Sequence, residues 1–450
     1  MKPGFRDKIT PVHPIEISTD NLISSLLNLS ETEPVCILDS CGVGHLGSHL
    51  MIAGIGPRET VEISNEDPER SLAELDRKFT DDLACIFTIS YDFGLKLLGL
   101  KHRIKEPTAA TGPDLFIARF NTLIVHDYDN CTTNIVGDRG KFDSISEKLL
   151  TNISIVRSEN SHLAPTITSN FSKPEYLAAV ESIRESIRNG DTYQTNLTQQ
   201  FTAMLPKDLT PQLIFNRLRR DHPAPFAAFM NRLDSTVVSA SPERFIHVSD
   251  GKITTSPIKG TRPRGKTEDE DVMLRQALLT SAKDRSENTM IVDLLRNDLG
   301  RVCEYGSVRV EKLCDIEEHP TLFHLVSTVS GELRSDTRFS EILKAVFPCG
   351  SITGAPKIST MRIIDEIETA TRGLSMGAIG YYVPKSGFGL PETLDMSVAI
   401  RTMVIRENTA TFNVGGGIVI DSEPEQEYEE MLVKAKALLA AIGAGPGRNP

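Results

Sequence analysis

Helical and strand-like spacings of hydrophobic residues alternate along this chain of 450 residues. Near its start, Leu22, Leu26 and Leu29 recur at helical intervals and predict one amphipathic helix from about Ile15 to Asn28. Short runs rich in β-branched and aromatic residues then predict strands at Val35–Leu38, Ala84–Ser90, Leu115–His126 and Thr132–Val136. We interpret residues 1–156 as a β-rich N-terminal region.

The pattern changes after Arg157–Lys173, a stretch rich in Ser, Asn, Thr and Pro that we interpret as a linker or surface loop. Beyond it, helical and strand patterns alternate through a second region, residues 171–440. We interpret residues 441–450, which follow this region, as a flexible tail. Helices are predicted at Lys173–Asn189, at Pro211–Arg220, at Val272–Leu299 (one helix or two), and after Pro356 and Glu423. A charged loop is predicted at Lys266–Asp271. Strands are predicted at Tyr193–Ala203, Tyr381–Val383 and Ala410–Val414.

A β-hairpin is the clearest local prediction. Phe245–Thr255 consists of two strand-like runs around Asp250-Gly251, a dipeptide that favours a tight turn with positive φ angles. In this hairpin Ser249 pairs with Lys252, so that Glu243 falls opposite a residue next to Lys259.

Lys259 belongs to Ser256–Gly265, a segment whose prolines and glycines suit neither a long helix nor a central strand. Strict alternation along the hairpin would put Glu243 and Lys259 on opposite faces of the sheet. A shared site therefore requires a bulge or break near Pro242 or Pro257, and we expect that break.

Acidic residues recur on two predicted helices. Asp284 and Glu287 are three residues apart and share a helix face. Glu427 and Glu430 lie in the first turns of the last helix, and Lys434 follows Glu430 by one turn. Taken alone, these acids fit a solvated helix face and ordinary partners of a helix dipole.

Two glycine-bearing segments could bring a ligand close to the backbone. Pro348–Lys357, with Thr353 and Gly354, precedes a helix whose free N–H groups could receive a carboxylate. Gly415, Gly416 and Gly417 follow a predicted strand and leave room beside the main chain. A glycine triplet alone is more often a kink than a site.

Composition limits the function classes. The net charge of -12 argues against non-specific binding to nucleic acid or to an anionic membrane. The seven cysteines are odd in number and contain no CxxC pair, which is typical of reduced thiols in a cytosolic protein. No run approaches the ~18 apolar residues of a membrane span, and the first residues lack a signal core. We expect a soluble cytoplasmic protein that binds neither nucleic acid nor membrane.

Cys41, His45 and His49 have a spacing that could suggest a metal site. Their glycine and leucine neighbours favour a tight turn packed on a core, and no fourth ligand is evident. Cys41 and His45 also resemble a glutaminase nucleophile and its base only superficially, because the flanking sequence lacks the expected turn.

Together these segments resemble the chorismate-utilising enzymes, the family of anthranilate, aminodeoxychorismate, isochorismate and salicylate synthases. The resemblance runs from about Phe171 to Leu439 and is loose before that. It implies an α+β fold of two large antiparallel-rich sheets packed as a sandwich with helices outside, to which both halves of the chain contribute strands. The matching segments, in family order, are Ser241–Phe245, Ser256–Gly265, Asp284–Arg301, His324–Ser327, Ser351–Lys357, Ala399–Thr402 and Gly415–Lys434.

Two positions discriminate within the family. Lys259 stands where anthranilate synthases typically have alanine, and the form Pro-Ile-Lys-Gly-Thr resembles aminodeoxychorismate synthase component I. Gln194 stands where isochorismate and salicylate synthases have a water-activating lysine. The resemblance therefore implies an amine rather than water as the entering group. Anthranilate synthase component I is the alternative, and a catalytically silent regulatory subunit is a weaker one.

The resemblance also implies roles for individual residues. Lys259 would be a covalent nucleophile, Glu243 a general acid and base, and His324 would lie near the departing hydroxyl. Arg401 and Lys434 would bind the pyruvyl carboxylate of chorismate. Backbone groups of Thr353, Gly354 and Gly415–Gly417, together with Gln194, would contact substrate. Four acids would hold Mg²⁺, which suits all-oxygen ligands: Glu287 and Glu430 directly, Asp284 and Glu427 through water.

Attack by Lys259 requires its neutral form, which burial and nearby cations favour; a metal, Arg262 and Arg264 are the candidates. The nitrogen source implied is a separate glutamine amidotransferase subunit. Members of the family can also bind tryptophan at an N-terminal motif that Leu38-Asp39-Ser40 matches in part.

Overall fold

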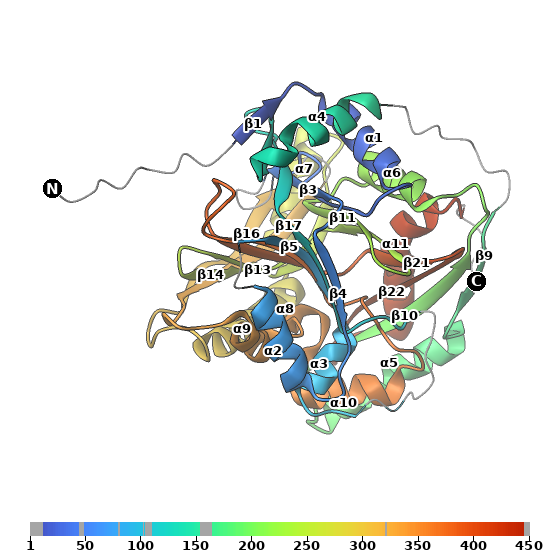
Figure 1. Ribbon diagram of the computed structural model, residues 1–450. Helices are drawn as coiled ribbons and strands as arrows, with labels where there is room; N and C mark the ends of the chain where they lie inside the picture. The colour runs from blue at the N-terminus through green and yellow to red at the C-terminus, as the bar shows by residue number, and fades with distance from the viewer. Residues whose placement is uncertain are drawn as a thin grey trace.

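A computed structural model of the chain describes residues 12–44, 49–79, 82–101, 103, 110–153, 164–319 and 322–444. Two large antiparallel sheets form its centre (Figure 1). Within the described residues the first sheet has 12 strands. In spatial order they are β1 (Val12–Ile15), β8 (Thr132–Gly137), β7 (Thr122–Asp127), β3 (Leu50–Ile55), β2 (Val35–Asp39), β11 (Phe226–Asn231), β12 (Thr236–Ser241), β21 (Thr402–Arg406), β22 (Thr409–Ile418), β10 (Gln194–Met204) and β18 (Gly354–Ala355), while β9 (Thr166–Ser169) also pairs with β10.

The second sheet has 10 strands in the same described ranges. It begins at the edge strand that carries Lys259 and ends with strands from the N-terminal region. The order is β15 (Ile258–Pro263), β17 (Leu322–Glu332), β14 (Lys252–Thr255), β13 (Arg244–Ser249), β20 (Thr393–Val398), β19 (Ala378–Val383), β5 (Ala84–Ile89), β6 (Leu115–Phe120) and β4 (Glu59–Ile63), with β16 (Arg309–Glu318) on the other side of β17.

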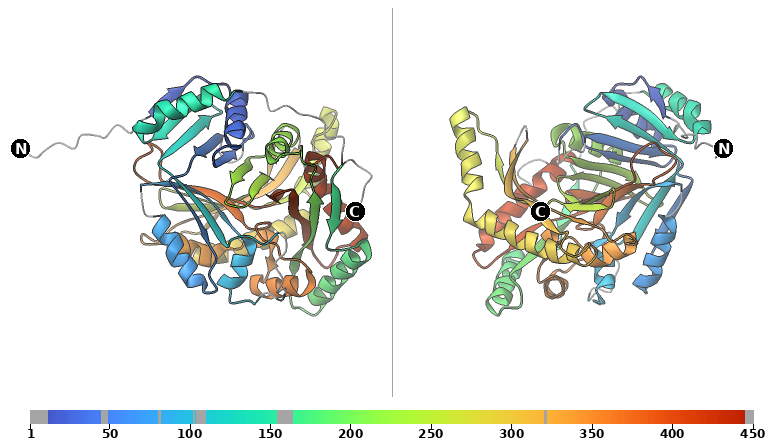
Figure 2. Two further views of the ribbon diagram at one scale, coloured as in Figure 1. Left: turned by 45° about the vertical axis from the view of Figure 1, so that its right-hand side comes forward. Right: turned by 90° about the vertical axis from the view of Figure 1, so that its left-hand side faces the viewer.

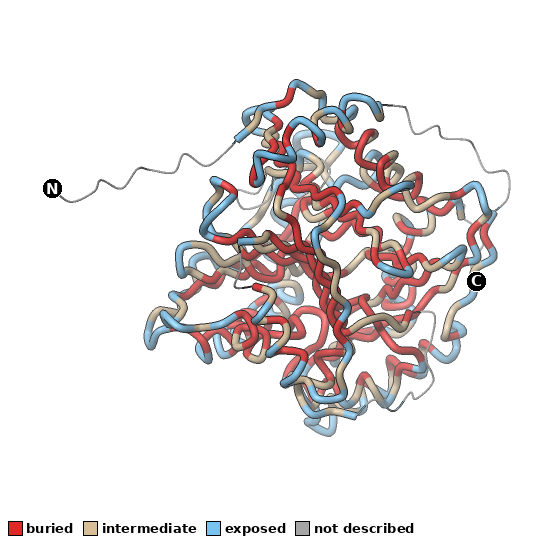
Figure 3. The backbone as a smooth tube through the Cα atoms, in the orientation of Figure 1, coloured by how far each residue is buried: buried red, intermediate tan, exposed pale blue. Residues whose placement is uncertain are grey.

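Helices cover the outer faces of both sheets, so the predicted α+β sandwich is confirmed. The burial pattern follows this layering, because the sheets are mostly buried and the outer helix faces are exposed (Figure 3). The first sheet packs against α1 (Thr19–Leu29), α4 (Phe142–Thr151), α5 (Lys173–Arg188), α6 (Pro211–Asp221) and α11 (Pro424–Ala441). The second packs against α2 (Pro68–Lys78), α3 (Tyr91–Leu97), α8 (Ala282–Gly300) and α9 (Phe339–Val346).

The remaining helical segments in the described ranges are α10 (Lys357–Ile367) against β10 and β18, α7 (Glu268–Leu279) beside β15, and two short turns of 3-10 helix, η1 (Arg139–Lys141) and η2 (Gly350–Ile352). Figure 2 shows α7, in yellow, standing away from the body of the molecule. A separate core lies between the two sheets, because alternate residues of each strand point inward. Its members come from both sheets and include Cys36, Ile52, Met230, Ile86, Phe116 and Ile379.

Three predicted elements differ in the structure. The run predicted as one strand, Leu115–His126, is two strands, because the chain passes from the second sheet to the first at Asn121. The first helix begins at Thr19 rather than near Ile15, since the Ser18 hydroxyl accepts a hydrogen bond from the Asn21 N–H and caps it there. The predicted charged loop ends earlier, because Thr267 caps α7 and its acids form the first turn.

The hairpin prediction is confirmed. Ser249 pairs with Lys252 across Asp250 and Gly251, whose φ angles are 51° and 75°. Beyond the hairpin, β14 and β15 both pair along β17, and the register shifts between Ile258 and Thr261. The predicted break therefore lies just after Pro257.

Strands from the first 156 residues occur in both sheets, including β2 and β3 in one and β5 and β6 in the other. The division of the chain at residues 156 and 171 stays a prediction, and the end of the predicted tail lies outside the described residues. No helix in the described ranges is long and apolar enough to cross a membrane.

Candidate active site

A cavity of about 700 Å³ opens where β15 and β17 of one sheet face β22 of the other, with α8 and α11 alongside. It collects most of the residues that the sequence singled out. Of the predicted site residues, its walls include Glu243, Lys259, Asp284, Glu287, His324, Arg401, Gly415, Gly416, Gly417, Glu427, Glu430 and Lys434.

Local backbone geometry brings Glu243 and Lys259 to the same wall. Glu243 precedes β13, and its carbonyl accepts a hydrogen bond from the Val398 N–H at 3.0 Å. Lys259 lies in the irregular part of β15, next to Gly260 at φ 80°. A Cβ on Gly260 would come within 2.8 Å of the Asp284 Cγ, so glycine lets this bulge approach α8.

Glu243 is 5% exposed, and desolvation raises the pKa of its carboxyl to about 7. Hydrogen bonding from Ser351, the charge of Lys259 and the Ile258 N–H act in the opposite direction. Its Oε1 has no hydrogen-bond partner among the described residues. A carboxyl group with a pKa near neutrality can both donate and accept a proton at physiological pH.

His324 on β17 faces β15, and its Nδ1 lies 2.9 Å from the Thr261 hydroxyl. The ring of His319 packs edge-on against it, with centroids 5.3 Å apart. These contacts orient the imidazole at the cavity wall.

Cationic side chains lie close to three of the four predicted metal ligands, and two of these contacts are short. Arg262 donates to Asp284 at 3.0 Å, and Lys434 donates to Glu430 at 2.8 Å within α11. Lys434 also donates to the carbonyl of Gly415 at 3.2 Å. Each of these acids is thus engaged on one side and faces the cavity on the other.

Of the other two acids, Glu427 is buried and Glu287 is half-buried. Glu427 accepts a hydrogen bond from the Ser422 hydroxyl at 2.7 Å, and the Lys283 ammonium lies 3.8 Å from it. Glu287 has no ion pair within the part of the chain that the structure describes, and burial raises the pKa of its carboxyl. In that same part no three acidic, histidine or cysteine side chains converge as a metal site.

The donor set nevertheless suits a hard divalent cation, because it offers carboxylate oxygens without thiolate or imidazole. Glu287 supplies an unpaired carboxylate that a cation would neutralise.

Arg401 is the cation best placed for a ligand carboxylate. It occupies a turn before β21 with φ 48°, and its carbonyl accepts from the Ala240 N–H at 3.0 Å. Burial lowers the pKa of its guanidinium, and no acidic partner faces it within the described ranges. A desolvated arginine fork of this kind favours bidentate binding of a planar anion.

The glycines are part of strand β22 rather than a loop after it. Gly415, Gly416 and Gly417 pair with Thr198, Leu197 and Asn196 of β10. Of the three, Gly416 is the one whose missing side chain faces the cavity residues Lys434 and Glu427, whereas a Cβ on Gly415 or Gly417 would meet Leu197 or Gln194.

Three predicted contacts lie one layer behind the wall. Gln194 is fully buried under Gly417, and neither polar atom of its amide has a hydrogen-bond partner among the described residues. Thr353 turns its hydroxyl back to the carbonyl of Cys349, and Gly354 pairs with Thr195 in β18. These three residues therefore do not line the cavity, and their contact with substrate stays a prediction.

Arg264 also departs from its expected place near Lys259. It pairs with Asp271 at 2.7 Å and stacks over the ring of Phe323, on the α7 side of β15. Arg262 alone of the two arginines lines the cavity.

Some cavity residues were missed from the sequence. Ser351 belonged to a quoted motif but received no role, although it hydrogen-bonds toward Glu243. Nothing in the local sequence marks the others, which reach the cavity only through the tertiary fold: Asn196, His222, Lys283 and Asn413.

A second, small cavity of about 50 Å³ lies between the sheets. Leu38 and Ser40 line it from the first sheet, and Tyr381 and Met396 from the second. The Ser40 hydroxyl is buried and has no hydrogen-bond partner in the described ranges.

Cys41 nearby does not have the environment of a reactive thiol. Its Sγ lies 3.6 Å from the Asp39 carboxylate, and burial raises its pKa well above the usual range. His49 pairs with Asp129 at 2.5 Å, while His45 lies outside the described residues.

Comparison with known proteins places this geometry in a family. Residues 33–440 match the family described as chorismate binding enzyme. An aminodeoxychorismate synthase from Streptomyces pristinaespiralis is 45% identical over 272 residues, which are 60% of this chain and 37% of that protein. Anthranilate synthase component 1 from Aquifex aeolicus is 42% identical over 274 residues, 61% of this chain and 54% of that protein. These matches thus span only about a third to a half of the relatives' length.

The fold has a solved counterpart. The crystal structure of anthranilate synthase component I from Streptococcus pneumoniae TIGR4 superposes with a TM-score of 0.74 at 28% identity, covering 88% of this chain and 93% of that one. The chain belongs to the chorismate-binding enzyme family.

Proposed function

We propose that this protein is an aminodeoxychorismate synthase component I, which converts chorismate and ammonia to 4-amino-4-deoxychorismate for p-aminobenzoate and folate synthesis. The observation that carries the proposal is Lys259 in the same cavity as Glu243, whose pKa is raised to about 7. A lysine nucleophile beside a carboxyl that can deliver a proton is what displacement of a hydroxyl group requires.

In the first step the neutral Lys259 amine forms a bond to C2 of the chorismate ring. The ring double bonds shift, and the C4–oxygen bond breaks. Protonated Glu243 donates its proton to the departing hydroxyl, which leaves as water. The imidazole of His324 lies on the same cavity wall and orients this oxygen.

In the second step ammonia forms a bond to C4, and the double bonds shift back as the C2–nitrogen bond to Lys259 breaks. Glu243, now ionised, accepts the proton that the new amine loses. Because each step exchanges one nucleophile for another, no oxidant or reductant is needed.

Substrate binding rests on the two carboxylates of chorismate. Arg401 and Lys434 suit the pyruvyl carboxylate, and the backbone of Gly415–Gly417 allows close approach. Glu287 and Glu430 would hold Mg²⁺ directly, and Asp284 and Glu427 would hold it through water. When bound, Mg²⁺ would supply positive charge for the ring carboxylate and reduce repulsion between the acids.

We further propose that ammonia arrives from a glutamine amidotransferase subunit. The environment of Cys41, buried beside Asp39 with a raised pKa, supports a partner as the source, because a glutaminase needs an activated thiol.

Anthranilate synthase component I remains the alternative, since relatives with both names have similar identity to this chain. Product identity separates the two. Purified protein would be incubated with chorismate, Mg²⁺ and excess ammonium salt at mildly alkaline pH, and its products identified by mass spectrometry. We expect 4-amino-4-deoxychorismate. Anthranilate, or no conversion, would overturn the proposal.

The Lys259→Arg variant provides the matched comparison. It keeps the positive charge but cannot supply a neutral amine at this pH. Loss of the amino product in the variant, with chorismate binding retained, would support a nucleophilic lysine. Full activity would make Lys259 a binding residue only.

We also propose that the cavity at Ser40 binds tryptophan, which its unpaired hydroxyl and apolar walls favour. The cavity would have to widen to admit an indole. Since the chain contains no Trp, added tryptophan fluoresces against a dark background. A blue-shifted signal is expected, and an unchanged spectrum at saturation would exclude the site.

A further inference from the structure

The edge of strand β10 behind the active site is closed by side chains instead of by a strand. β18 pairs with Gln194 and Thr195, and β9 pairs only from Phe201 onward. The backbone groups between them must find other partners, because buried peptide groups are costly when unpaired.

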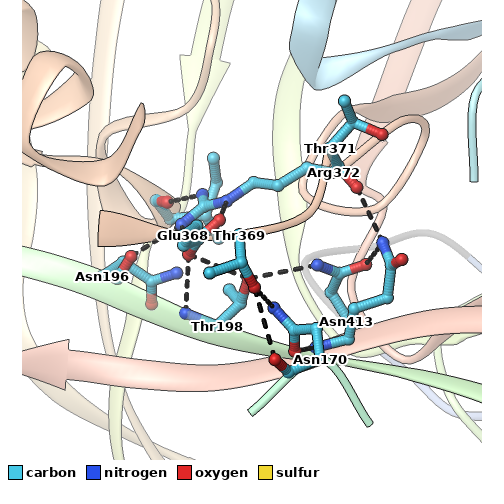
Figure 4. Close-up of polar contacts among 10 residues, drawn as sticks. Asn170, Asn196, Thr198, Glu368, Thr369, Thr371, Arg372 and Asn413 are labelled. Atoms are coloured by element: carbon cyan, nitrogen blue, oxygen red, sulfur yellow. Dashed lines mark hydrogen bonds and ion pairs between the residues drawn. The ribbon is translucent and has the colours of Figure 1, made fainter. Parts of the chain in front are cut away.

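Two charged residues fill this gap. Figure 4 shows Glu368 and Arg372 side by side against β10. The carboxylate of Glu368 accepts from the Thr198 backbone N–H at 2.8 Å and from the Thr198 hydroxyl at 2.9 Å. Arg372 donates to the carbonyl of Asn196 at 2.7 Å.

The pair is itself bidentate and fully desolvated. Arg372 donates through Nε and Nη2 to the two oxygens of Glu368 at 2.9 and 2.7 Å. Their side chains are 2% and 4% exposed, and the guanidinium lies 4.4 Å from the ring centre of Tyr91. Water cannot replace either partner without opening the core.

The remaining donor of Arg372 reaches the active-site loop. Its Nη1 donates to the carbonyl of Ile352 at 3.0 Å. Ile352 follows Ser351, which lines the cavity together with Glu243. The Ser351 hydroxyl lies 3.3 Å from the Cys349 Sγ, and hydrogen bonding from it lowers the pKa of the Glu243 carboxyl. The adjacent carbonyl of Thr353 accepts from the Asn196 N–H at 2.8 Å. One guanidinium therefore holds both the loop that carries Ser351 and the strand that carries Asn196, a cavity residue.

We propose that Arg372 and Glu368 form a positioning pair for the proton transfer at Glu243, acting through Ser351. The proposal rests on the proposed role of Glu243 as general acid. Neither member of the pair lines the cavity, so neither is a catalytic residue. Their function is to hold Ser351 next to the carboxyl group of Glu243. They do this in place of a strand, which is absent, among the described residues, from the edge of β10 between β18 and β9.

Release of the Ile352 carbonyl would withdraw Ser351 from Glu243. The groups that face this carboxyl are Ser351, Lys259, the Ile258 N–H and the Cys349 thiol. Because Ser351 opposes the rise in the pKa of Glu243, its loss raises that pKa further. At high pH kcat falls because Glu243 loses its proton, and this fall is the alkaline limb of the pH profile. A higher pKa of Glu243 moves the alkaline limb to higher pH.

The test compares R372K and E368Q with R119K. Arg119 is 5% exposed and pairs with Glu59 on β4, in the strands at the opposite edge of the second sheet from Lys259. We expect the two pair variants to lose kcat about 10- to 100-fold, as misplacement of a reacting group does, with KM for chorismate changing much less. R119K should change thermal stability but neither kcat nor the alkaline limb.

A double-mutant cycle of R372K with Ser351→Ala tests whether the pair acts through Ser351. If the pair acts through Ser351, R372K shifts the alkaline limb in the wild-type background and adds little in S351A. A folded R372K with wild-type kcat and limb, or an equal shift in both backgrounds, would overturn the proposal. If R372K fails to fold, T198V provides the test, because it removes only the hydroxyl contact to Glu368. It should shift the alkaline limb of kcat in the same direction as R372K, but by less.

These comparisons use whichever product the wild-type protein forms. An anthranilate product would overturn the proposed function, whereas the positioning role fails if R372K leaves kcat and the limb unchanged or shifts the limb equally with and without Ser351.

Discussion

Gln194 lies directly beneath Gly417: a Cβ on the glycine would come within 2.3 Å of the Gln194 amide nitrogen. The glutamine is fully buried, so the surrounding core would have to take up any shift of its amide. Gly416, one residue earlier, points the other way, where a Cβ would meet the Lys434 ammonium at 3.3 Å in the cavity.

Gly417→Ala should therefore destabilise the protein by about 1–3 kcal/mol, the usual cost of overpacking. Gly416→Ala is the matched control, because its methyl group would meet only the ends of the Lys434 and Glu427 side chains, at 3.3 and 3.5 Å; it should raise KM with little change in stability. Thermal unfolding and steady-state kinetics on both variants check this. Equal unfolding temperatures for the two variants would contradict the packing seen here.

Glu243 makes stability depend on pH. Its pKa is about 7 in the folded protein, against ~4.3 for an exposed glutamate, so the folded state holds this proton more tightly. Stability contributed by the neutral carboxyl is present at low pH and is lost as pH rises between these two values. Above pH 7 the folded protein contains a buried charge.

Glu243→Gln should remove this dependence. At pH 8.5 the variant should be more stable than the wild type by about 3 kcal/mol, and near pH 4 the difference should vanish. Denaturant unfolding at the two pH values measures it. A wild type that is the more stable at pH 8.5 would mean that attraction from Lys259 outweighs desolvation.

The hairpin and strands such as β2, β5 and β8 could be predicted from the sequence, because alternation and the Asp250-Gly251 turn are local signals. The sandwich was implied by the family resemblance, and strands such as β11, β12 and β17 were not predicted. The sequence also predicted the break that brings Glu243 and Lys259 together. It could not predict that Leu115–His126 crosses between sheets at Asn121, since both halves have the same strand-like pattern.

Side-chain direction was the harder problem in the site. Gln194 begins β10, and only the pairing of Asn196 with Gly417 shows that it lies under the glycines. His222 and Lys283 reach the cavity from the ends of two helices far apart in the sequence. The role of Arg372 depends on a gap between β18 and β9, which no single segment encodes.

Mg²⁺ should stabilise the protein through Glu287. Binding at ten times the Kd adds ~1.4 kcal/mol to the free energy of unfolding, whatever the activity. We expect thermal unfolding to shift upward on addition of MgCl₂ in the wild type and in Glu366→Gln, an acid on the far end of α10. Glu287→Gln should lose most of the shift. A full shift in that variant would remove Glu287 from the proposed ligands.

Removal of the metal by a chelator tests its role in activity. EDTA should abolish conversion of chorismate, and excess Mg²⁺ should restore it. Activity that persists after exhaustive chelation would contradict a role for the acids in binding a metal.

Substitution of Arg401 should show whether the two-pronged guanidinium, and not positive charge alone, binds the ligand carboxylate. Arg401→Lys keeps the charge at this turn but loses one of two hydrogen bonds to a ligand carboxylate. A hydrogen bond to a charged group contributes about 1.5–3 kcal/mol, so kcat/KM should fall roughly 10- to 100-fold, mainly through KM. Arg406→Lys, at the far end of the strand that follows Arg401 and paired with Asp234 at 3.0 Å, should leave both parameters unchanged. If Arg401→Lys keeps the wild-type KM, the carboxylate binds elsewhere, and Lys434 becomes the better candidate.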